Sequence, residues 1–218
     1  MRVVVATQNR GKLAELRQLL DGTGLELVGI DQAGVVLPDV EETGDTYVAN
    51  ALLKARAIAA ATGLPTLADD SGLEVDALGG EPGVRSARYA GDAGPKANTE
   101  KLLVAMERVP DGARSARFRC VIVLLPSLDA EPIVAEGRCE GAIARAPRGG
   151  GGFGYDPVFE VAPEELALLP GRAGQRLTMA ELDDAEKNAI SHRGRAIDVL
   201  RAAVASLARS PGARRSPW

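Results

Sequence analysis

Apolar residues recur along the chain at two spacings, and these separate the expected strands from the expected helices. Short runs rich in Val, Ile and Leu predict buried strands, at residues 3–6, 25–30, 64–68, 116–125 and within 133–145. Apolar residues three or four positions apart predict helices, over residues 13–20, 47–62, 96–109 and 191–208. The first strand therefore leads through a polar loop into the first helix.

The strand expected at residues 64–68 is followed at once by two carboxylates, Asp69 and Asp70, and then by Ser71 and Gly72. This order predicts a strand that stops in a tight turn. Two adjacent carboxylates repel each other, and burying them unpaired is costly. A hard cation such as Mg²⁺ would neutralise them. The alternative is a solvated turn in which these residues have only a local role.

The polar loop after the first strand, Thr7 to Lys12, enters a helix. A helix N-terminus presents backbone N–H groups and the positive end of the helix dipole, which suits a phosphate group, and Lys12 adds a charge. The loop is not a Walker A motif, because the first Gly of that motif is missing and Leu13 replaces the Ser or Thr. An ordinary polar connection is the alternative.

A glycine-rich run, GGGGFGYD, occupies residues 149–156. It satisfies G-x-G-x-x-G in form, but Tyr155 and Asp156 precede a proline where a dinucleotide-binding helix would begin, so that motif is excluded. Aromatic residues make up only 3% of the chain. We therefore expect Phe153 and Tyr155 to stack on a ligand rather than fill the core.

Several smaller features carry local predictions. Alternation over residues 73–78 predicts a half-exposed strand. Gly137 and Gly141 are candidate β-bulges, residues 164–175 are expected to form a loop, and Thr178 to Glu181 is a capping box.

Composition narrows the class of protein. The 218 residues carry a net charge of −4, which argues against a general nucleic-acid coat. Two cysteines, Cys120 and Cys139, are expected to be free buried thiols, and a single histidine excludes a multi-histidine zinc centre. No run reaches transmembrane length. We expect a cytoplasmic protein without membrane or direct nucleic-acid partners, with one domain over residues 1–208 and a frayed tail over 209–218.

Five stretches, in this order, resemble the inosine/xanthosine triphosphate pyrophosphatase family. They are TQNRGK at 7–12, EETGDTYVANALLK at 41–54, ADDSG at 68–72, GFGYD at 152–156 and EKNAISHRG at 186–194. Together they span nearly the whole chain up to about residue 205. Two positions depart from the family pattern: Ala49 stands where Glu is usual, and Gln8 where Gly is frequent.

The resemblance implies an α/β fold with a mixed, strongly twisted sheet flanked by helices, two lobes around a central cleft, and a homodimer. It implies Mg²⁺-dependent cleavage between the α- and β-phosphates of inosine, deoxyinosine and xanthosine triphosphates. The products would be a nucleoside monophosphate and pyrophosphate, and these non-standard purines would be kept out of DNA and RNA.

The resemblance also implies roles for individual residues. Glu42 and Asp70 would hold Mg²⁺ with support from Asp69, and Asp70 would orient or deprotonate the attacking water. The residues expected to hold the phosphates are Thr7, Gln8, Asn9, Arg10, Gly11, Lys12, Lys54 and Ser71. Those expected around the base are Phe153, Gly154, Tyr155, Asp156, Lys187, His192 and Arg193.

The basic residues of this set suggest how a base could be chosen. Lys187 and Arg193 offer only donors, so they favour a purine with a 6-keto acceptor over adenine, whose amino group is a donor. Arg193 is the residue expected to read the 6-position, and Lys187 is the next candidate. The argument does not explain how guanine would be rejected.

Two rival functions come from other classes. A haloacid-dehalogenase-type phosphatase needs two Asp separated by one residue, but here they are adjacent and Ser71 takes the second place. A non-catalytic nucleotide-binding module would need Lys12 and the glycine-rich loop but no acidic pair. Released pyrophosphate, released orthophosphate and no turnover distinguish the three functions.

Overall fold

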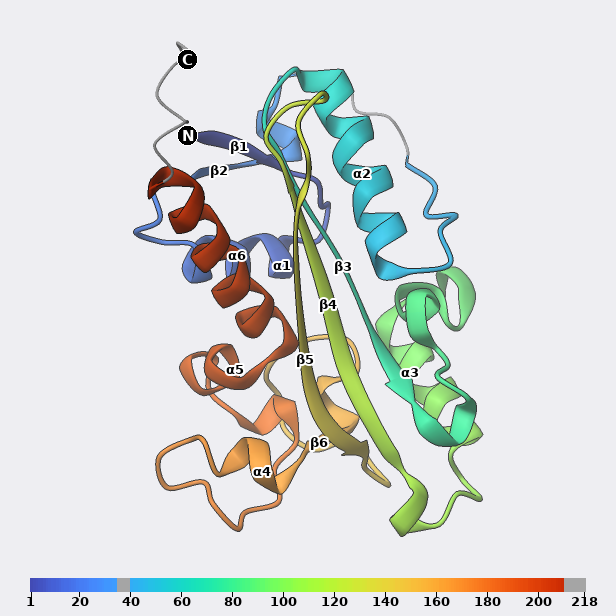
Figure 1. Ribbon diagram of the computed structural model, residues 1–218. Coiled ribbons are helices and arrows are strands. Elements are labelled where there is room, and N and C mark those ends of the chain that lie inside the picture. The colour runs from blue at the N-terminus through green and yellow to red at the C-terminus, as the bar shows by residue number, and fades with distance from the viewer. Residues whose placement is uncertain (35–39, 210–218) are drawn as a thin grey trace.

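The computed structural model describes residues 1–34 and 40–209, which form six strands in one sheet, ordered β2-β1-β3-β4-β5-β6 (Figure 1). The strands are β1 Arg2–Val5, β2 Glu26–Gly29, β3 Thr66–Val75, β4 Ser115–Leu125, β5 Ile133–Ile143 and β6 Phe159–Val161. β1 pairs in parallel with β2 and β3, and the pairs from β3 to β6 are antiparallel. The predicted mixed sheet flanked by helices is confirmed.

The helices are α1 Arg10–Leu19, α2 Tyr47–Thr62, α3 Gly94–Ala105, α4 Pro163–Leu166, α5 Asp184–Ile190 and α6 His192–Arg209. The bounds of α2 are those predicted, because the Thr46 side chain caps its first turn and Gly63 ends it with φ at 68°. α3 ends four residues earlier than expected. The tail predicted beyond α6 lies outside the described residues.

Alternate residues of the central strands form separate cores on the two faces of the sheet. Ala68, Val121 and Val123 pack with α2 on one face. Leu67 and Ile122 pack with residues of α1 and α6 on the other face. Figure 1 shows α2 and α6 on opposite sides of the long strands. This alternation decides where neighbouring side chains point, including those of the acidic pair.

The tight turn predicted at the acidic pair is wrong. β3 runs without interruption from Thr66 to Val75, and Asp69 and Asp70 pair in register with Ile122 and Val121 of β4. Successive residues of a strand point to opposite faces, so the two carboxylates are separated by the sheet instead of by a turn. The run of Asp, Ser and Gly favours a turn on local preference alone. Pairing with the long strand β4 outweighs that preference and keeps the chain extended.

Three further predictions need correction. The strand expected over residues 73–78 stops at Val75 and continues as a 3₁₀ helix, and residues 163–166 form α4 inside the expected loop. Gly137 and Gly141 are not bulges, since the β4–β5 register is continuous through both. A Cβ at Gly137 would lie 2.2 Å from the His192 carbonyl oxygen, so glycine there lets α6 approach β5.

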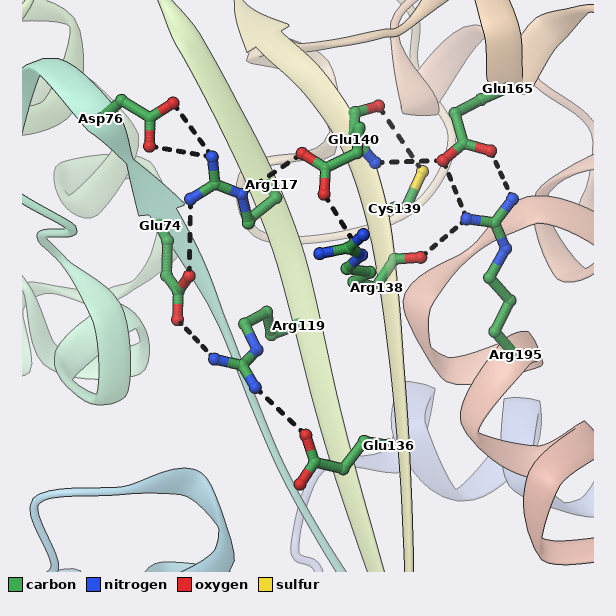
Figure 2. Close-up of polar contacts among 10 residues, drawn as sticks. All are labelled: Glu74, Asp76, Arg117, Arg119, Glu136, Arg138, Cys139, Glu140, Glu165 and Arg195. Carbon is green, nitrogen blue, oxygen red and sulfur yellow. Dashed lines mark hydrogen bonds and ion pairs between the residues drawn. The ribbon is translucent and has the colours of Figure 1, made fainter.

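On the face of the sheet against which α2 packs, alternate residues of β3, β4 and β5 continue beyond the apolar core as a row of charged side chains (Figure 2). We call this row the charged ladder; its members are Glu74, Asp76, Arg117, Arg119, Glu136, Arg138 and Glu140. Arg117 bridges Asp76 at 2.9 Å and Glu140 at 3.2 Å, while Arg119 bridges Glu74 and Glu136. Such cross-strand pairs fix the register of three strands on a face open to water.

Both cysteines are buried free thiols, as predicted, and burial raises the pKa of each thiol to about 12. Within the described residues, none of the helices has the length and apolar character needed to cross a membrane.

Candidate active site

A cavity of about 320 Å³ lies where α1, β3, the glycine-rich loop and the α5–α6 junction meet. It brings together ten of the residues predicted to bind substrate: Asn9, Lys12, Ser71, Phe153, Gly154, Tyr155, Asp156, Lys187, His192 and Arg193. Leu73, Ser86, Ala87, Pro95, Asn98 and Phe118 complete the lining together with Gly72. Segments far apart in the sequence therefore build one cavity whose lining combines apolar side chains with the cations Lys12, Lys187 and Arg193.

On the cavity side of β3, Asp69 is 1% exposed and faces two cations. Its Oδ2 lies 2.9 Å from Lys12 Nζ and 3.2 Å from an Arg193 nitrogen, while its Oδ1 is buried without a partner. Burial alone would raise the pKa of Asp69, but Lys12, Arg193 and Lys54 outweigh it and hold the pKa well below its ordinary value. Asp69 therefore stays ionised and holds Lys12 and Arg193 in place.

Glu15 joins Lys187 and Arg193 to α1 and was missed in the sequence. It accepts from Lys187 Nζ at 2.9 Å and from Arg193, and Lys187 also lies 2.9 Å from Asp156 Oδ2. Burial lowers the pKa of Lys187, but Asp156 and Glu15 raise it by more than burial lowers it. The net pKa is raised, so the amine stays charged. The available signal was spacing, because Glu15 lies three residues after Lys12 and hence on the same side of α1.

The other face of β3 carries the second acidic site. Asp70 Oδ2 accepts from Asn50 at 3.1 Å, and Asp70 Oδ1 lies 3.8 Å from Lys54 Nζ. Lys54 also donates to Glu42 at 2.8 Å and to the Asp69 carbonyl oxygen at 2.6 Å. Lys54, placed four residues after Asn50 on α2, thus reaches the carboxylates of Glu42 and Asp70 and also the backbone of β3.

The pKa values of the two carboxyl groups of this second site are shifted in opposite directions. Burial raises the pKa of Asp70 although Lys54 opposes it, and the negative charge of Glu42 raises it further. For Glu42 the effect of burial is outweighed by Lys54, Lys12 and Arg88, so its pKa is lowered. A carboxyl with a raised pKa beside a firmly ionised one suits a proton acceptor next to a fixed negative charge.

The loop before α1 is a capped helix start. Asn9 caps α1, and its Oδ1 accepts from the backbone N–H groups of Gly11 at 2.9 Å and Lys12 at 3.2 Å. Thr7 accepts from the Asn9 N–H. Asn9 and Lys12 line the cavity, while Gly11 lies close to the Phe153 ring. Gln8 is exposed, and the Arg10 side chain lies outside the described part of the chain.

The two aromatic residues of the glycine-rich loop differ. Phe153 is 37% exposed, with Lys187 Nζ 4.7 Å from its ring centroid. Tyr155 belongs to the buried core, and its O–H donates to the Ser86 carbonyl oxygen at 2.9 Å. The expectation that both rings stack on a ligand instead of filling the core is therefore wrong for Tyr155, whose ring packs in the core although it also lines the cavity. Stacking by Phe153 stays a prediction.

His192 lines the cavity and packs on an aromatic ring. It is 6% exposed and stacks on Phe118 with ring centroids 4.8 Å apart, and its Nδ1 has no partner within the described chain. Burial, with help from Arg193 and Lys187, lowers its pKa well below the ordinary value. His192 is thus a neutral ring with a buried nitrogen that has no partner in the described chain.

The predicted metal ligands fall on two faces. Glu42 and Asp70 share Lys54, whereas the Asp69 carboxylate points to the opposite side of β3. Among the described residues, no three His, Cys, Asp or Glu side chains are close enough to hold a metal by themselves. Mg²⁺ is ordinarily held by one or two carboxylates together with substrate phosphates. The carboxylates of Glu42 and Asp70 fit that mode.

Comparison with known proteins gives consistent matches over most of the chain. The Ham1 family matches residues 3–203. A dITP/XTP pyrophosphatase of Thioalkalivibrio sulfidiphilus is 52% identical over 202 residues, covering 92% of this chain and 96% of the relative. The dITP/XTP pyrophosphatase of Escherichia coli K12 is 50% identical over 201 residues, covering 91% and 95%.

Solved structures agree with the sequence matches. A Ham1 protein from Coxiella burnetii superposes with a TM-score of 0.81 at 47% identity, covering 94% of this chain and 99% of that one. A nucleoside-triphosphatase/dITP/XTP pyrophosphatase from Mycobacterium abscessus has a TM-score of 0.69 at 44% identity, covering 92% and 98%.

Proposed function

The chain belongs to the Ham1 family, and we propose that it hydrolyses the triphosphates of inosine, deoxyinosine and xanthosine to the monophosphate and pyrophosphate. Relatives named dITP/XTP pyrophosphatases share about half of its residues over more than nine-tenths of its length. Such an enzyme removes non-standard purines before they enter DNA or RNA.

The observation that carries this proposal is that the two faces of β3 offer two different sites. One face offers a cavity with an exposed ring and fixed cations, and the other offers two carboxylates around Lys54. Lys12 and Lys54 both approach Asp69, so the two sites meet at one residue of the strand. A nucleotide with its base in the cavity would direct its phosphates past Lys12 toward Lys54 and Asp70.

We propose that Mg²⁺ is held by Glu42 and Asp70 together with substrate phosphates. When bound, the ion neutralises charge on the phosphates and favours attack by water. Asp70 is the residue we assign to orient or deprotonate that water, because its carboxylate lies beside Glu42 and Lys54 and burial raises its pKa above the ordinary value for Asp. Lys54, held by Glu42 and the Asp69 carbonyl oxygen, stabilises negative charge next to it.

For the base, we propose that Phe153 stacks on the purine and that Lys187 reads its 6-keto oxygen. Arg193, the residue first expected to read that oxygen, already donates to Glu15, Asp69 and Ser71, and its Nε is buried without a partner. Lys187 gives two hydrogen bonds to Glu15 and Asp156 and retains a third donor. Adenine would oppose that donor with its own amino group, and such a mismatch can cost about 10⁴ in kcat/KM.

The test is the set of products formed from inosine triphosphate and Mg²⁺. Inosine monophosphate and pyrophosphate are expected, with ¹⁸O from labelled water in the monophosphate alone. Orthophosphate would favour the dehalogenase-type phosphatase, and binding without turnover would favour a nucleotide-binding module. Label in the pyrophosphate would place the attack at the β-phosphorus and contradict the proposed geometry.

We further propose a homodimer, on the strength of the family resemblance, and a reducing compartment such as the cytoplasm, in keeping with the free thiols of Cys120 and Cys139. Light scattering of the purified chain tests the dimer directly, and a monomer at micromolar concentration would contradict it.

A further inference from the structure

Glu42 is located by two cations from different parts of the chain. Lys54 Nζ lies 2.8 Å from one carboxylate oxygen. Arg88 donates to the other carboxylate oxygen at 3.2 Å and to the Glu42 backbone carbonyl at 2.8 Å. Among the described residues, these are the side chains that donate to Glu42. Arg88 therefore fixes both where the backbone lies and how the carboxylate is turned.

The segment that carries Glu42 has little structure of its own. Residues 40–44 belong to neither a helix nor a strand. Gly44 N–H donates to Asn50 Oδ1 at 2.8 Å, which ties the end of the segment to α2. At Glu42 itself the hydrogen bonds to the rest of the chain come from Arg88 and Lys54. Loss of Arg88 would leave one cation to hold the carboxylate.

Arg88 ends the 3₁₀ helix η3 (Gly83–Arg88), and two other residues of that helix, Ser86 and Ala87, line the base cavity. The Ser86 carbonyl oxygen accepts from Tyr155, and the Ala87 carbonyl oxygen accepts from Asn98 at 2.9 Å. Ser86 Oγ accepts from the Leu73 N–H of β3 at 2.8 Å. One short segment thus touches the cavity at two residues and holds a catalytic carboxylate at the next.

We propose that Arg88 is a positioning residue that sets Glu42 in place for Mg²⁺ and couples that placement to the base cavity. This inference rests on the proposed function, in which Glu42 holds the ion. A base that fills the cavity packs against Ser86 and Ala87 and so holds η3 more firmly in the position that these hydrogen bonds set. The ordered η3 holds Arg88, which holds Glu42, so a fitting base raises the turnover rate as well as the affinity.

The first experiment measures binding without turnover. The probe is an inosine triphosphate analogue with a methylene group between the α and β phosphorus atoms, titrated with and without Mg²⁺ into wild type, Arg88→Met and Arg88→Lys. In Arg88→Met the metal-free affinity should stay within twofold, while the gain in affinity from Mg²⁺ should fall by about tenfold, the usual cost of losing a partner of a metal ligand. Lys keeps the charge but lacks the second donor arm, so partial rescue is expected.

Arg85→Met is the matched control. Arg85 lies on the same 3₁₀ helix and is exposed, and the side chains that reach Glu42 in the described chain belong to Arg88 and Lys54. The substitution removes the same charge from the same segment, so its effect on the Mg²⁺ gain should be less than twofold. Arg88 has a side chain that is 45% exposed, so all three variants are expected to melt within a few degrees of wild type.

The second experiment tests the coupling. Turnover of inosine triphosphate is compared with that of ribose 5-triphosphate, which has the same phosphates but no base. Arg88→Met should lower kcat for inosine triphosphate by about tenfold and affect the base-free substrate much less. Equal losses on both substrates would overturn the coupling.

The remaining outcomes are also decisive. A weakened metal-free affinity with an intact Mg²⁺ gain would make Arg88 a phosphate ligand and overturn the positioning role. A Mg²⁺ gain within twofold of wild type in Arg88→Met would overturn it as well. Failure of the proposed function is distinguishable from all of these, since it is seen in the wild type as absence of pyrophosphate release.

Discussion

Two networks of acids and bases lie on opposite faces of the sheet. The charged ladder (Figure 2) is open to water, with side chains such as Arg119 and Glu136 exposed at 39% and 50%. The network behind β3 is buried, and the Asp69 and Arg193 side chains are 1% and 2% exposed. Both networks consist of bridged ion pairs, so the number of pairs does not distinguish them.

The difference lies in what burial costs. Exposed ion pairs contribute about 0 to 1 kcal/mol each, and every ladder residue already has its partner in the described chain. Buried pairs cost several kcal/mol of desolvation per ion, which their attraction repays only when every polar atom is satisfied. Asp69 Oδ1 and Arg193 Nε are not satisfied. A buried network left incomplete indicates a ligand site, whereas a complete exposed one stabilises the sheet.

The largest effect is expected at Asp70. Asp70→Asn keeps the shape but removes the negative charge and the proton acceptor, so turnover of inosine triphosphate should fall by about 10² to 10⁴. Glu42→Gln should give a loss in the same range. Glu136→Gln in the ladder is the control that changes the same chemical group, and its turnover should match wild type. Near-normal turnover of Asp70→Asn at saturating Mg²⁺ would end its assignment as the base.

Next in size is the stability of the buried network. Arg193→Met breaks the buried pairs of Arg193 with Asp69 and Glu15 and leaves each carboxylate one cation, and breaking a buried pair typically costs about 3 to 5 kcal/mol. Urea unfolding at neutral pH should show this loss in the midpoint with an unchanged slope. Substituting Arg193 and Asp69 together, as Arg193→Met with Asp69→Leu, should recover part of it. A loss below 1 kcal/mol would mean that water reaches the network and that the contrast with the ladder is wrong.

The sequence predicted what depends on local chemistry. The bounds of α2 were predicted from its caps at Thr46 and Gly63. Cavity residues such as Lys12, Phe153 and Lys187 were predicted from the sequence motifs that contain them. It failed where a distant partner decides the outcome. The residues after Ala68 favour a turn, but ten residues of β3 pair with β4 and hold the chain extended.

The same limit explains the residues that were missed. Glu15 and Arg88 carry no motif of their own, and each gains its role from partners far along the chain: Glu15 from Lys187 and Arg193, and Arg88 from Glu42. Such contacts exist only once the sheet and helices are placed. The separation of Asp69 from Asp70 could have been anticipated by writing the segment as a strand, since alternation alone sends them to opposite faces.

A smaller, pH-dependent effect is expected from His192, the single histidine of the chain. Its folded-state pKa lies well below 6.5, so it stays neutral in the fold while the unfolded chain takes up a proton. Stability should therefore be complete above the unfolded pKa and should fall as pH drops below about 6.5, by at most about 1.4 kcal/mol per pH unit. Unfolding curves at pH 7.5, 6.5 and 5.5 measure the slope, and His192→Gln should flatten it. An equal slope in the variant would assign the dependence to other groups.

The smallest effect is expected in the charged ladder. Arg119→Met removes the bridge between Glu74 and Glu136, and an exposed bridge of this kind is worth about 0 to 1 kcal/mol. The loss should shrink further in about 1 M salt, where the screening length is about 3 Å. Turnover of inosine triphosphate should remain that of wild type, because Arg119 neither lines the cavity nor contacts Glu42, Asp70 or Lys54. These expectations are checked by measuring the unfolding free energy of Arg119→Met in low and high salt together with its turnover. A stability loss of several kcal/mol, or one that salt does not reduce, would show that water does not reach the ladder as its exposure implies. A fall in turnover at unchanged stability would show instead that the ladder has a functional role, and the difference between the two networks would then be one of degree.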